Sequence, residues 1–204
     1  MIMSLRNLAW FSLALVLSGC VNFGFTGDED SPAIVYYVLE DGGRAVADSA
    51  PAAKTLLLAD ATAGAFYDTD GMAFSSRAGT RGYYQYARWS ERSSKRLSDL
   101  LLGRLEREKI FSAVAQSGSS VRGDWLLTTD ILDLHHDAAQ QPGVVRMELR
   151  AELIDLKTRK LLARRNFVHT VAVPSFDAAG AHKAFSQATT LALNDIADWL
   201  KELA

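Results

Sequence analysis

The stretch VVRMELRAELID, residues 144–155, decides how this chain folds. Apolar side chains occupy the odd positions from Val145 to Leu153, and arginine or glutamate occupies each even position between them. Because successive side chains of a β-strand point to opposite faces, such a strand has one apolar face and one charged face. The pattern therefore predicts a long strand in a sheet that water wets on one side. A turn is expected at 155–159, and residues 160–173 return as the partner strand of a hairpin.

Amphipathic helices are expected to cover the apolar face of this hairpin. Residues 178–203 carry an apolar stripe at three- and four-residue spacing, with Ser175 or Asp177 as the expected cap. The stripe consists of Phe185, Ala188, Ala192, Ile196, Trp199 and Leu203. Residues 90–109 predict a second such helix, with Ser90 as its N-cap. Its stripe consists of Leu97, Leu101 and Leu105.

Runs of β-branched, aromatic and leucine residues predict several further strands. They are residues 34–39, 55–59, 72–75, 83–86, 110–115 and 125–134. A sheet with one apolar face is covered most economically by helices packed on that face. The expected fold is therefore α/β, a single two-layer domain over residues 34–204. Its mixed sheet contains a long antiparallel hairpin and is covered by amphipathic helices.

The N-terminus resembles a bacterial lipoprotein signal. Residues 1–7 carry one positive charge, and residues 8–16 (LAWFSLALV) are apolar. The signal peptidase motif follows directly as Leu17, Ser18 and Gly19, and then comes Cys20, the only cysteine of the chain. The apolar run is shorter than the roughly 20 residues that a membrane-spanning helix needs. We therefore expect residues 1–19 to be a removable signal peptide and Cys20 to carry lipid; an ordinary secretory signal with a chance thiol is the alternative.

Residues 20–33 predict a flexible tether between the lipid and the domain, because they combine glycine, acidic residues and a proline without periodicity. The residue after Cys20 is Val21 rather than aspartate. In enterobacteria-like sorting, an aspartate at that place retains a lipoprotein at the inner membrane. The expected location is therefore the periplasmic face of the outer membrane, with the inner membrane as the alternative.

Composition and motifs argue against several classes of function. The formal net charge is -2, so the chain lacks the strongly basic character that binds nucleic acid. One cysteine excludes an internal disulfide framework and a multi-cysteine zinc site. The sequence contains no Gly-x-Ser-x-Gly elbow, Walker loop or His-Glu-x-x-His motif. We therefore expect a protein that is not an enzyme and that needs no cofactor.

One cluster of metal-type ligands occurs, at Asp133, His135, His136 and Asp137. On a strand, Asp133 and His135 would share one face, which falls short of the three or four ligands of a zinc site. His169 would add a third ligand if its strand lay beside theirs. A solvated strand end without metal is the preferred interpretation, and a metal-dependent enzyme is the alternative.

Two surfaces are candidates for binding a partner. The first is the aromatic segment of Tyr83, Tyr84, Tyr86 and Trp89. Alternation along a strand leaves some of these rings partly exposed, and aromatic side chains often anchor interfaces. Covering the core and one sheet edge is the preferred interpretation of these rings, and partner binding is the alternative. The second is the charged hairpin face of Arg146, Glu148, Arg150 and Glu152, for which cross-strand pairs are the preferred interpretation.

The order of these features resembles the ABC-type transport auxiliary lipoproteins, a family that includes the lipoprotein of the paraquat-inducible MCE system. The resemblance lies in the lipobox, in IVYYVL at 34–39, and in YYQYARW at 83–89 before the leucine-rich helix. It extends from Ile34 to the C-terminus. The prolines that usually follow the tryptophan are missing, and Ser90, Glu91 and Arg92 stand in their place.

This resemblance implies a non-catalytic role at the outer-membrane end of a trans-envelope lipid pathway. The implied partners are the membrane, an MCE-domain protein, and the permease and ATPase of an ABC complex. The aromatic segment or the hairpin face is expected to dock the MCE-domain protein. An assembly or activator lipoprotein of a cell-wall synthase or secretion machine is the alternative.

Overall fold

The computed structural model describes residues 32–45 and 50–204. Within it, residues Ile34–Ala204 form one unit. The expected signal peptide, its motif at Leu17, Ser18 and Gly19, the lipidation site Cys20 and most of the expected tether lie outside the described residues. Of the helices in the part of the chain that the structure describes, none is long and apolar enough to cross a membrane.

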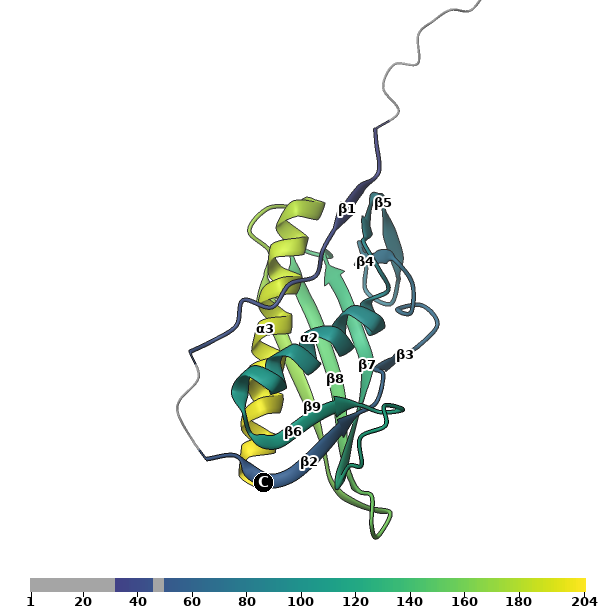
Figure 1. The fold of residues 1–204 in the computed structure, drawn as a ribbon. Helices are drawn as coiled ribbons and strands as arrows, with labels where there is room; N and C mark the ends of the chain where they lie inside the picture. The colour runs from purple at the N-terminus through teal and green to yellow at the C-terminus, as the bar shows by residue number, and fades with distance from the viewer. Residues whose placement is uncertain (1–31, 46–49) are drawn as a thin grey trace, which may run out of the picture. The chain divides into compact units, whose positions relative to one another are not determined.

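The described residues form nine strands and two helices (Figure 1). The strands are β1 (Val35–Tyr37), β2 (Ala52–Leu58), β3 (Thr62–Ala63), β4 (Gly71–Ser75), β5 (Gly82–Trp89), β6 (Phe111–Gln116), β7 (Trp125–Asp137), β8 (Val144–Asp155) and β9 (Lys160–Ala172). The helices are α2 (Ser93–Glu108) and α3 (Ala178–Leu203). All strands join one mixed sheet, so the expected α/β fold of a single two-layer domain is confirmed.

The long strand β7 organises this sheet. Along one side it pairs antiparallel with β8, which pairs with β9 to form the predicted hairpin. Along its other side it pairs in succession with β2, β3 and β4, all in parallel. Strand β6 extends the sheet beyond β2, whereas β5 and then β1 extend it beyond β4. β1 is therefore an edge strand, and it lies where the chain enters the domain.

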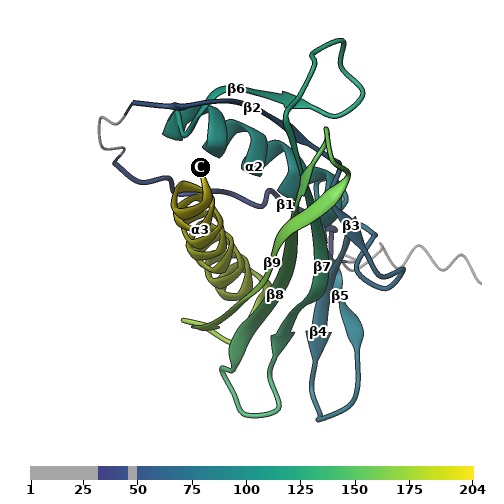
Figure 2. The same cartoon turned by 90° about the horizontal axis from the view of Figure 1, so that it is seen from below.

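Both helices pack on the same face of the sheet (Figure 2). The alternate apolar residues of β8 from Val145 to Leu153 are buried on that face, as the sequence predicts. Phe185 of α3 and Leu101 of α2 lie in the same core. Full burial of one such side chain contributes about 1.5–3 kcal/mol, so this layer supplies much of the stability. Leu203, the last residue of the predicted α3 stripe, is exposed at the end of the helix.

Helix α2 begins later than the sequence suggests. The Ser90 amide donates to the Tyr37 carbonyl at 2.8 Å, so Ser90 still extends the pairing with β1 and is not the N-cap. The helix starts at Ser93, after Arg92, whose side chain makes no capping hydrogen bond. For α3 the cap is Asp177, because its carboxylate accepts a hydrogen bond from the amide three residues later at 2.6 Å.

Candidate functional site

Residues 38–44, which we call the strap, follow β1 and cross the helical layer (Figure 1). Side chains of both helices hold its backbone. His182 of α3 hydrogen-bonds to one strap carbonyl at 2.7 Å, and Thr190 of α3 accepts from a strap amide at 2.8 Å. Arg96 of α2 donates to a second strap carbonyl at 2.8 Å. Because these backbone groups have fixed partners, the strap follows one defined path.

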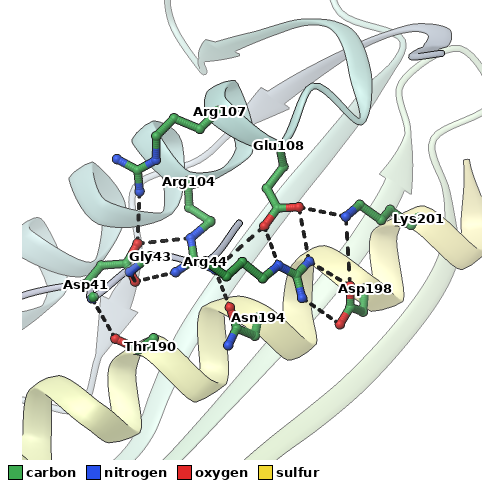
Figure 3. A network of polar contacts seen from close by, with 11 residues as sticks. Asp41, Gly43, Arg44, Arg104, Arg107, Glu108, Thr190, Asn194, Asp198 and Lys201 are labelled. Atoms are coloured by element: carbon green, nitrogen blue, oxygen red, sulfur yellow. Dashed lines mark hydrogen bonds and ion pairs between the residues drawn. The ribbon is translucent and has the colours of Figure 1, made fainter. Parts of the chain in front are cut away.

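At the centre of the strap, Asp41 forms a buried ion pair with Arg104 of α2 (Figure 3). The arginine Nε lies 3.0 Å from the carboxylate, and each side chain is only 1% exposed. Asn194 of α3 accepts a further N–H of Arg104, and Arg107 reaches Asp41 at 3.0 Å. Burial alone would raise the pKa of Asp41. Hydrogen bonds from Arg104 and the Gly43 amide, together with both arginine charges, outweigh burial and hold this pKa below its ordinary value.

A second group of charges fixes the end of the strap to both helices. The fully buried carboxylate of Glu108 on α2 accepts from Arg44 at 2.6 Å and from Lys201 of α3 at 2.7 Å. Arg44 also contacts both carboxylate oxygens of Asp198, at 2.7 and 2.8 Å. Burial would raise the pKa of Glu108, but these two cations lower it, and the hydrogen bonds to Asp198 and Glu108 raise the pKa of Arg44. These ion pairs therefore join the strap to both helices and the two helices to each other.

This cluster is not among the predicted sites, although the sequence carries a signal for it. Arg104 and Glu108 stand three residues after Leu101 and Leu105, and so fall within the apolar stripe of α2. A charge on a buried stripe must find a partner, because an unpaired charge in the core is costly. Charged residues at stripe positions thus predict that an oppositely charged segment packs on the helix.

The aromatic segment of β5 divides into exposed and buried rings. Tyr83 stacks on Phe66 with ring centroids 4.5 Å apart, and its hydroxyl donates to the Phe66 carbonyl at 2.7 Å. The ring also covers Gly71, where a Cβ would lie 2.5 Å from it. Tyr83 and Tyr86 are both exposed. These two rings are therefore accessible to a partner.

Tyr84, by contrast, is half-buried and makes a hydrogen bond to His136 of β7. Its hydroxyl lies 2.6 Å from Nδ1 of His136, whose Nε2 lies 2.7 Å from the Pro142 carbonyl. A carbonyl can only accept, so Nε2 carries the proton and Nδ1 accepts from the tyrosine. Burial lowers the pKa of His136 and raises the pKa of Tyr84 to about 12. Both groups are thus neutral near pH 7 and serve to join β5, β7 and the β7–β8 turn.

Trp89 is part of the core and not of the candidate partner surface. It is 3% exposed, and its ring packs edge-on against Phe185 of α3 with centroids 5.2 Å apart. Strict alternation would place Trp89 on the face of Tyr83. The pairing of β5 with β4 shifts register between Gly71 and Ala73, and this irregularity changes which residues face the helices.

Apolar side chains also emerge at the edge strand β1. Tyr37 packs against the ring of a histidine of α3, with centroids 5.2 Å apart. Its neighbours are exposed, and together we call them the β1 strip: Ile34, Val35, Tyr36 and Val38.

The interpretation of His135 and His136 as part of a solvated strand end is wrong. Strand β7 continues to Asp137, and both histidines are buried within it. As expected, Asp133 and His135 share a face, with the carboxylate 2.7 Å from Nδ1. The same carboxylate accepts the hydroxyl of Tyr67 at 2.7 Å. Asp133, His135 and Tyr67 therefore serve as one another's hydrogen-bond partners within the fold.

His169 does not join them, because β8 separates its strand from β7. Its Nε2 instead lies 3.3 Å from Asp195 of α3. In the described ranges 32–45 and 50–204, no group of three or more His, Cys, Asp or Glu side chains is placed to hold a metal ion.

The outer face of the hairpin carries cross-strand ion pairs, as expected from its alternating charges. The pairs are Arg146 with Asp137 at 3.1 Å, Arg150 with Asp130 at 2.9 Å, and Glu152 with Arg164 at 2.6 Å. Glu148 instead accepts a hydrogen bond from the neutral Asn166 at 2.9 Å. Because Arg146, Arg150 and Glu152 each have an opposite neighbour, most of the charge on this face is compensated.

Comparison with known proteins identifies the fold and a family. A model of the family described as the ABC-type transport auxiliary lipoprotein component matches residues 37–197. A crystal structure of a Xanthomonas campestris protein has a TM-score of 0.72 and 23% sequence identity, and the match covers 81% of this chain and 95% of that one. An uncharacterized protein of known crystal structure has a TM-score of 0.65 and 13% identity, over 85% of this chain and 100% of its own. At these identities the structures show the fold alone. A search of curated proteins finds no match.

Proposed function

Because this chain belongs to the family of ABC-type transport auxiliary lipoproteins, we propose that it is a lipid-anchored, non-catalytic component of an MCE-type lipid transport system at the outer membrane. The observation that carries the proposal is the family match over residues 37–197, which runs from β1 into α3. In such a system the permease and the ATPase are other proteins. This chain then has to hold and position a partner rather than perform chemistry.

In this proposal the N-terminal residues anchor the domain. Residues 1–19 are the signal peptide, with Leu17, Ser18 and Gly19 at the cleavage site, and residues 20–33 form the tether to the auxiliary lipoprotein domain at 34–204. Cys20 carries the lipid. One acyl chain binds a membrane only marginally, whereas two or three hold a protein firmly. Val21 favours the periplasmic face of the outer membrane over the inner membrane.

The exposed rings of Tyr83 and Tyr86 are the proposed docking surface for the MCE-domain protein. Phe66 holds the ring of Tyr83 in place: the two rings stack, and the Phe66 backbone carbonyl accepts a hydrogen bond from the Tyr83 hydroxyl. A ring that is already ordered loses little side-chain entropy on binding, which favours its use as an anchor. Tyr84 supports this surface by tying β5 to His136, and Trp89 supports it from the core.

The engagement of the reactive side chains supports a non-catalytic role. Asp133 and His135 bond to each other, and Tyr67 occupies the same carboxylate. His136 uses both ring nitrogens, one toward Tyr84 and one toward a backbone carbonyl. Each of these groups therefore has a structural partner that competes with any substrate.

Metabolic labelling with an alkyne analogue of palmitate tests the anchor. The wild-type protein is expected to incorporate the probe and to sediment with membranes, whereas Cys20→Ala should do neither. A wild-type protein that stays unlabelled would contradict the proposed lipidation of Cys20.

Co-purification tests the docking surface. The double variant Tyr83→Ala/Tyr86→Ala should recover much less of the MCE-domain protein from solubilised envelopes than wild type. Leu162→Ala is the matched control, since Leu162 is a similarly exposed apolar residue on β9. Wild-type recovery with the double variant would remove this surface from consideration. Recovery of a cell-wall synthase or secretion component in its place would support the alternative role in assembly.

A further inference from the structure

The β1 strip exposes more apolar surface than an edge strand usually shows. Four of the five residues from 34 to 38 are exposed, with Ile34 at 48%, Val35 at 49%, Tyr36 at 62% and Val38 at 42%. Protein edges are normally protected by charge, proline or a covering segment. Residues 34–38 (IVYYV) contain no charge and no proline. An exposed apolar strip of this kind indicates that a partner covers it and removes it from water.

The geometry of the strip distinguishes between kinds of partner. Val35 and Tyr36 are neighbours on a strand, so their side chains point to opposite faces of the sheet. Both are exposed, and only Tyr37 turns inward against α3. A rigid protein docked on one face would cover one of these side chains and leave the other in water. A fluid phase into which the edge dips would cover both.

The residue types of the strip fit the interface of a lipid bilayer. Tyrosine concentrates at membrane–water interfaces, because its ring is apolar and its hydroxyl stays near the headgroups. Aliphatic side chains such as Ile34 and Val35 enter the acyl boundary without a desolvation penalty. The strip has both kinds of side chain within five residues.

The position of the strip in the chain keeps it close to the bilayer that would hold the lipid of Cys20. Ile34 lies fourteen residues after Cys20, and an extended chain spans at most about 3.3–3.6 Å per residue, so the reach is within about 50 Å. If Cys20 is lipidated, as the proposed function states, the strip is confined near the membrane surface at a high effective concentration. A weak apolar contact is then populated far more than it would be by a domain free in solution.

We propose that the β1 strip is a second, non-covalent membrane contact that seats the domain edge-on in the headgroup region of the bilayer that holds its anchor. This inference rests on the proposed lipidation of Cys20. It orients the domain, because the β8–β9 turn lies at the opposite end of the sheet from β1 (Figure 1) and therefore points away from the membrane.

Spin labels measure this contact in the full mature lipoprotein. Cys20 is the only native cysteine, and lipidation consumes its thiol, so an introduced cysteine is the single site for a nitroxide. Val35→Cys and Tyr36→Cys sample the two faces of the strip. Leu162→Cys, 46% exposed near the β8–β9 turn, is the matched control. The labelled proteins are placed in vesicles of phosphatidylethanolamine and phosphatidylglycerol.

The expected result is that the labels at positions 35 and 36 collide with a water-soluble nickel chelate several-fold less often than the label at 162, while oxygen reaches them more readily. Adding Ile34→Ser and Tyr36→Ser to the Val35→Cys protein should restore access of the chelate. A label at 35 or 36 that is as accessible as that at 162 in vesicle-bound protein would overturn the membrane contact alone. Protection that arises only when the MCE-domain protein is added would overturn it in favour of a protein partner. A mature protein that takes up no fatty-acid probe and does not float with vesicles would overturn the proposed anchor, and the membrane contact with it.

Discussion

Replacing Asp41 with asparagine removes the charge that neutralises Arg104 inside the domain. The variant keeps a side-chain oxygen for the Gly43 amide, which Asp41 accepts at 2.9 Å. Removing one partner of a buried ion pair costs about 3–5 kcal/mol, because the other charge stays buried. Arg104 retains the oxygen of Asn194 and lies 3.7 Å from Glu108. These remaining contacts place the expected loss of stability at the lower end, about 3 kcal/mol.

Urea unfolding of the purified mature protein, followed by tryptophan fluorescence, measures this loss. Trp89, Trp125 and Trp199 are all buried and report on the core. For a domain of this size, about 3 kcal/mol corresponds to a fall in Tm of roughly 6–12 °C. Asp99→Asn is the control, since Asp99 pairs with Lys95 at the surface. It should leave the unfolding midpoint nearly unchanged.

The double variant Asp41→Asn/Arg104→Met separates the charge from the packing. Methionine fills a similar volume without a charge, and apolar replacement of a buried ion pair is often neutral or stabilising. The double variant should therefore be more stable than Asp41→Asn alone. If Asp41→Asn costs less than about 1 kcal/mol, or if the double variant is the less stable of the two, the unpaired charge on Arg104 is not what determines the effect.

Three further outcomes are expected. In the folded protein the pKa of Asp41 is lowered from 3.8 and that of Glu108 from 4.5. The two carboxylates therefore stabilise the fold above about pH 5, and this stabilisation is lost as the pH falls toward their pKa values in the folded protein. Urea unfolding midpoints measured between neutral and acid pH test this expectation. Gly143→Ala should destabilise by about 1–3 kcal/mol, because Gly143 has a φ of 89° and a Cβ would lie 2.3 Å from a backbone oxygen across the turn; thermal unfolding measures it. Tyr84→Phe leaves Nδ1 of His136 without a donor and should cost about 1–3 kcal/mol in the same assay, whereas an unchanged Tm would show that water replaces the hydroxyl.

The elements with strong periodicity could be predicted from the sequence almost to the residue. Strand β8 and helix α3 have the expected bounds. Each has one buried face and one exposed face, so the polarity of every residue indicates the face on which it lies. Two-residue β3 escaped prediction, since two residues carry no period. The register shift in β5 also escaped it, and this shift sends Trp89 into the core although alternation places it with Tyr83.

The strap cluster was hidden for a different reason. Arg104 and Glu108 look like ordinary surface residues of a helix when each is considered singly, because charged residues are mostly exposed. Their burial follows from a segment more than sixty residues earlier, where Asp41 and Arg44 supply the opposite charges. Local sequence pattern cannot report a partner so distant in the chain. The burial of His136 escapes prediction in the same way, because its hydrogen-bond partners, Tyr84 and the Pro142 carbonyl, lie outside β7.

The two attachments at the N-terminus of the domain differ in strength, and this decides what a pull on the tether does. Strand β1 pairs with β5 over three residues, and each net backbone hydrogen bond is worth only about 0.5–1.5 kcal/mol. Behind it, detaching the strap would take Asp41 away from Arg104 and Arg44 away from Glu108, and removing one partner of a buried ion pair costs about 3–5 kcal/mol. Tension should therefore peel β1 from the sheet before it disturbs the strap. The β1 strip lies on the part that yields first, so contact with a bilayer would resist the peeling at the point where the fold itself is weakest.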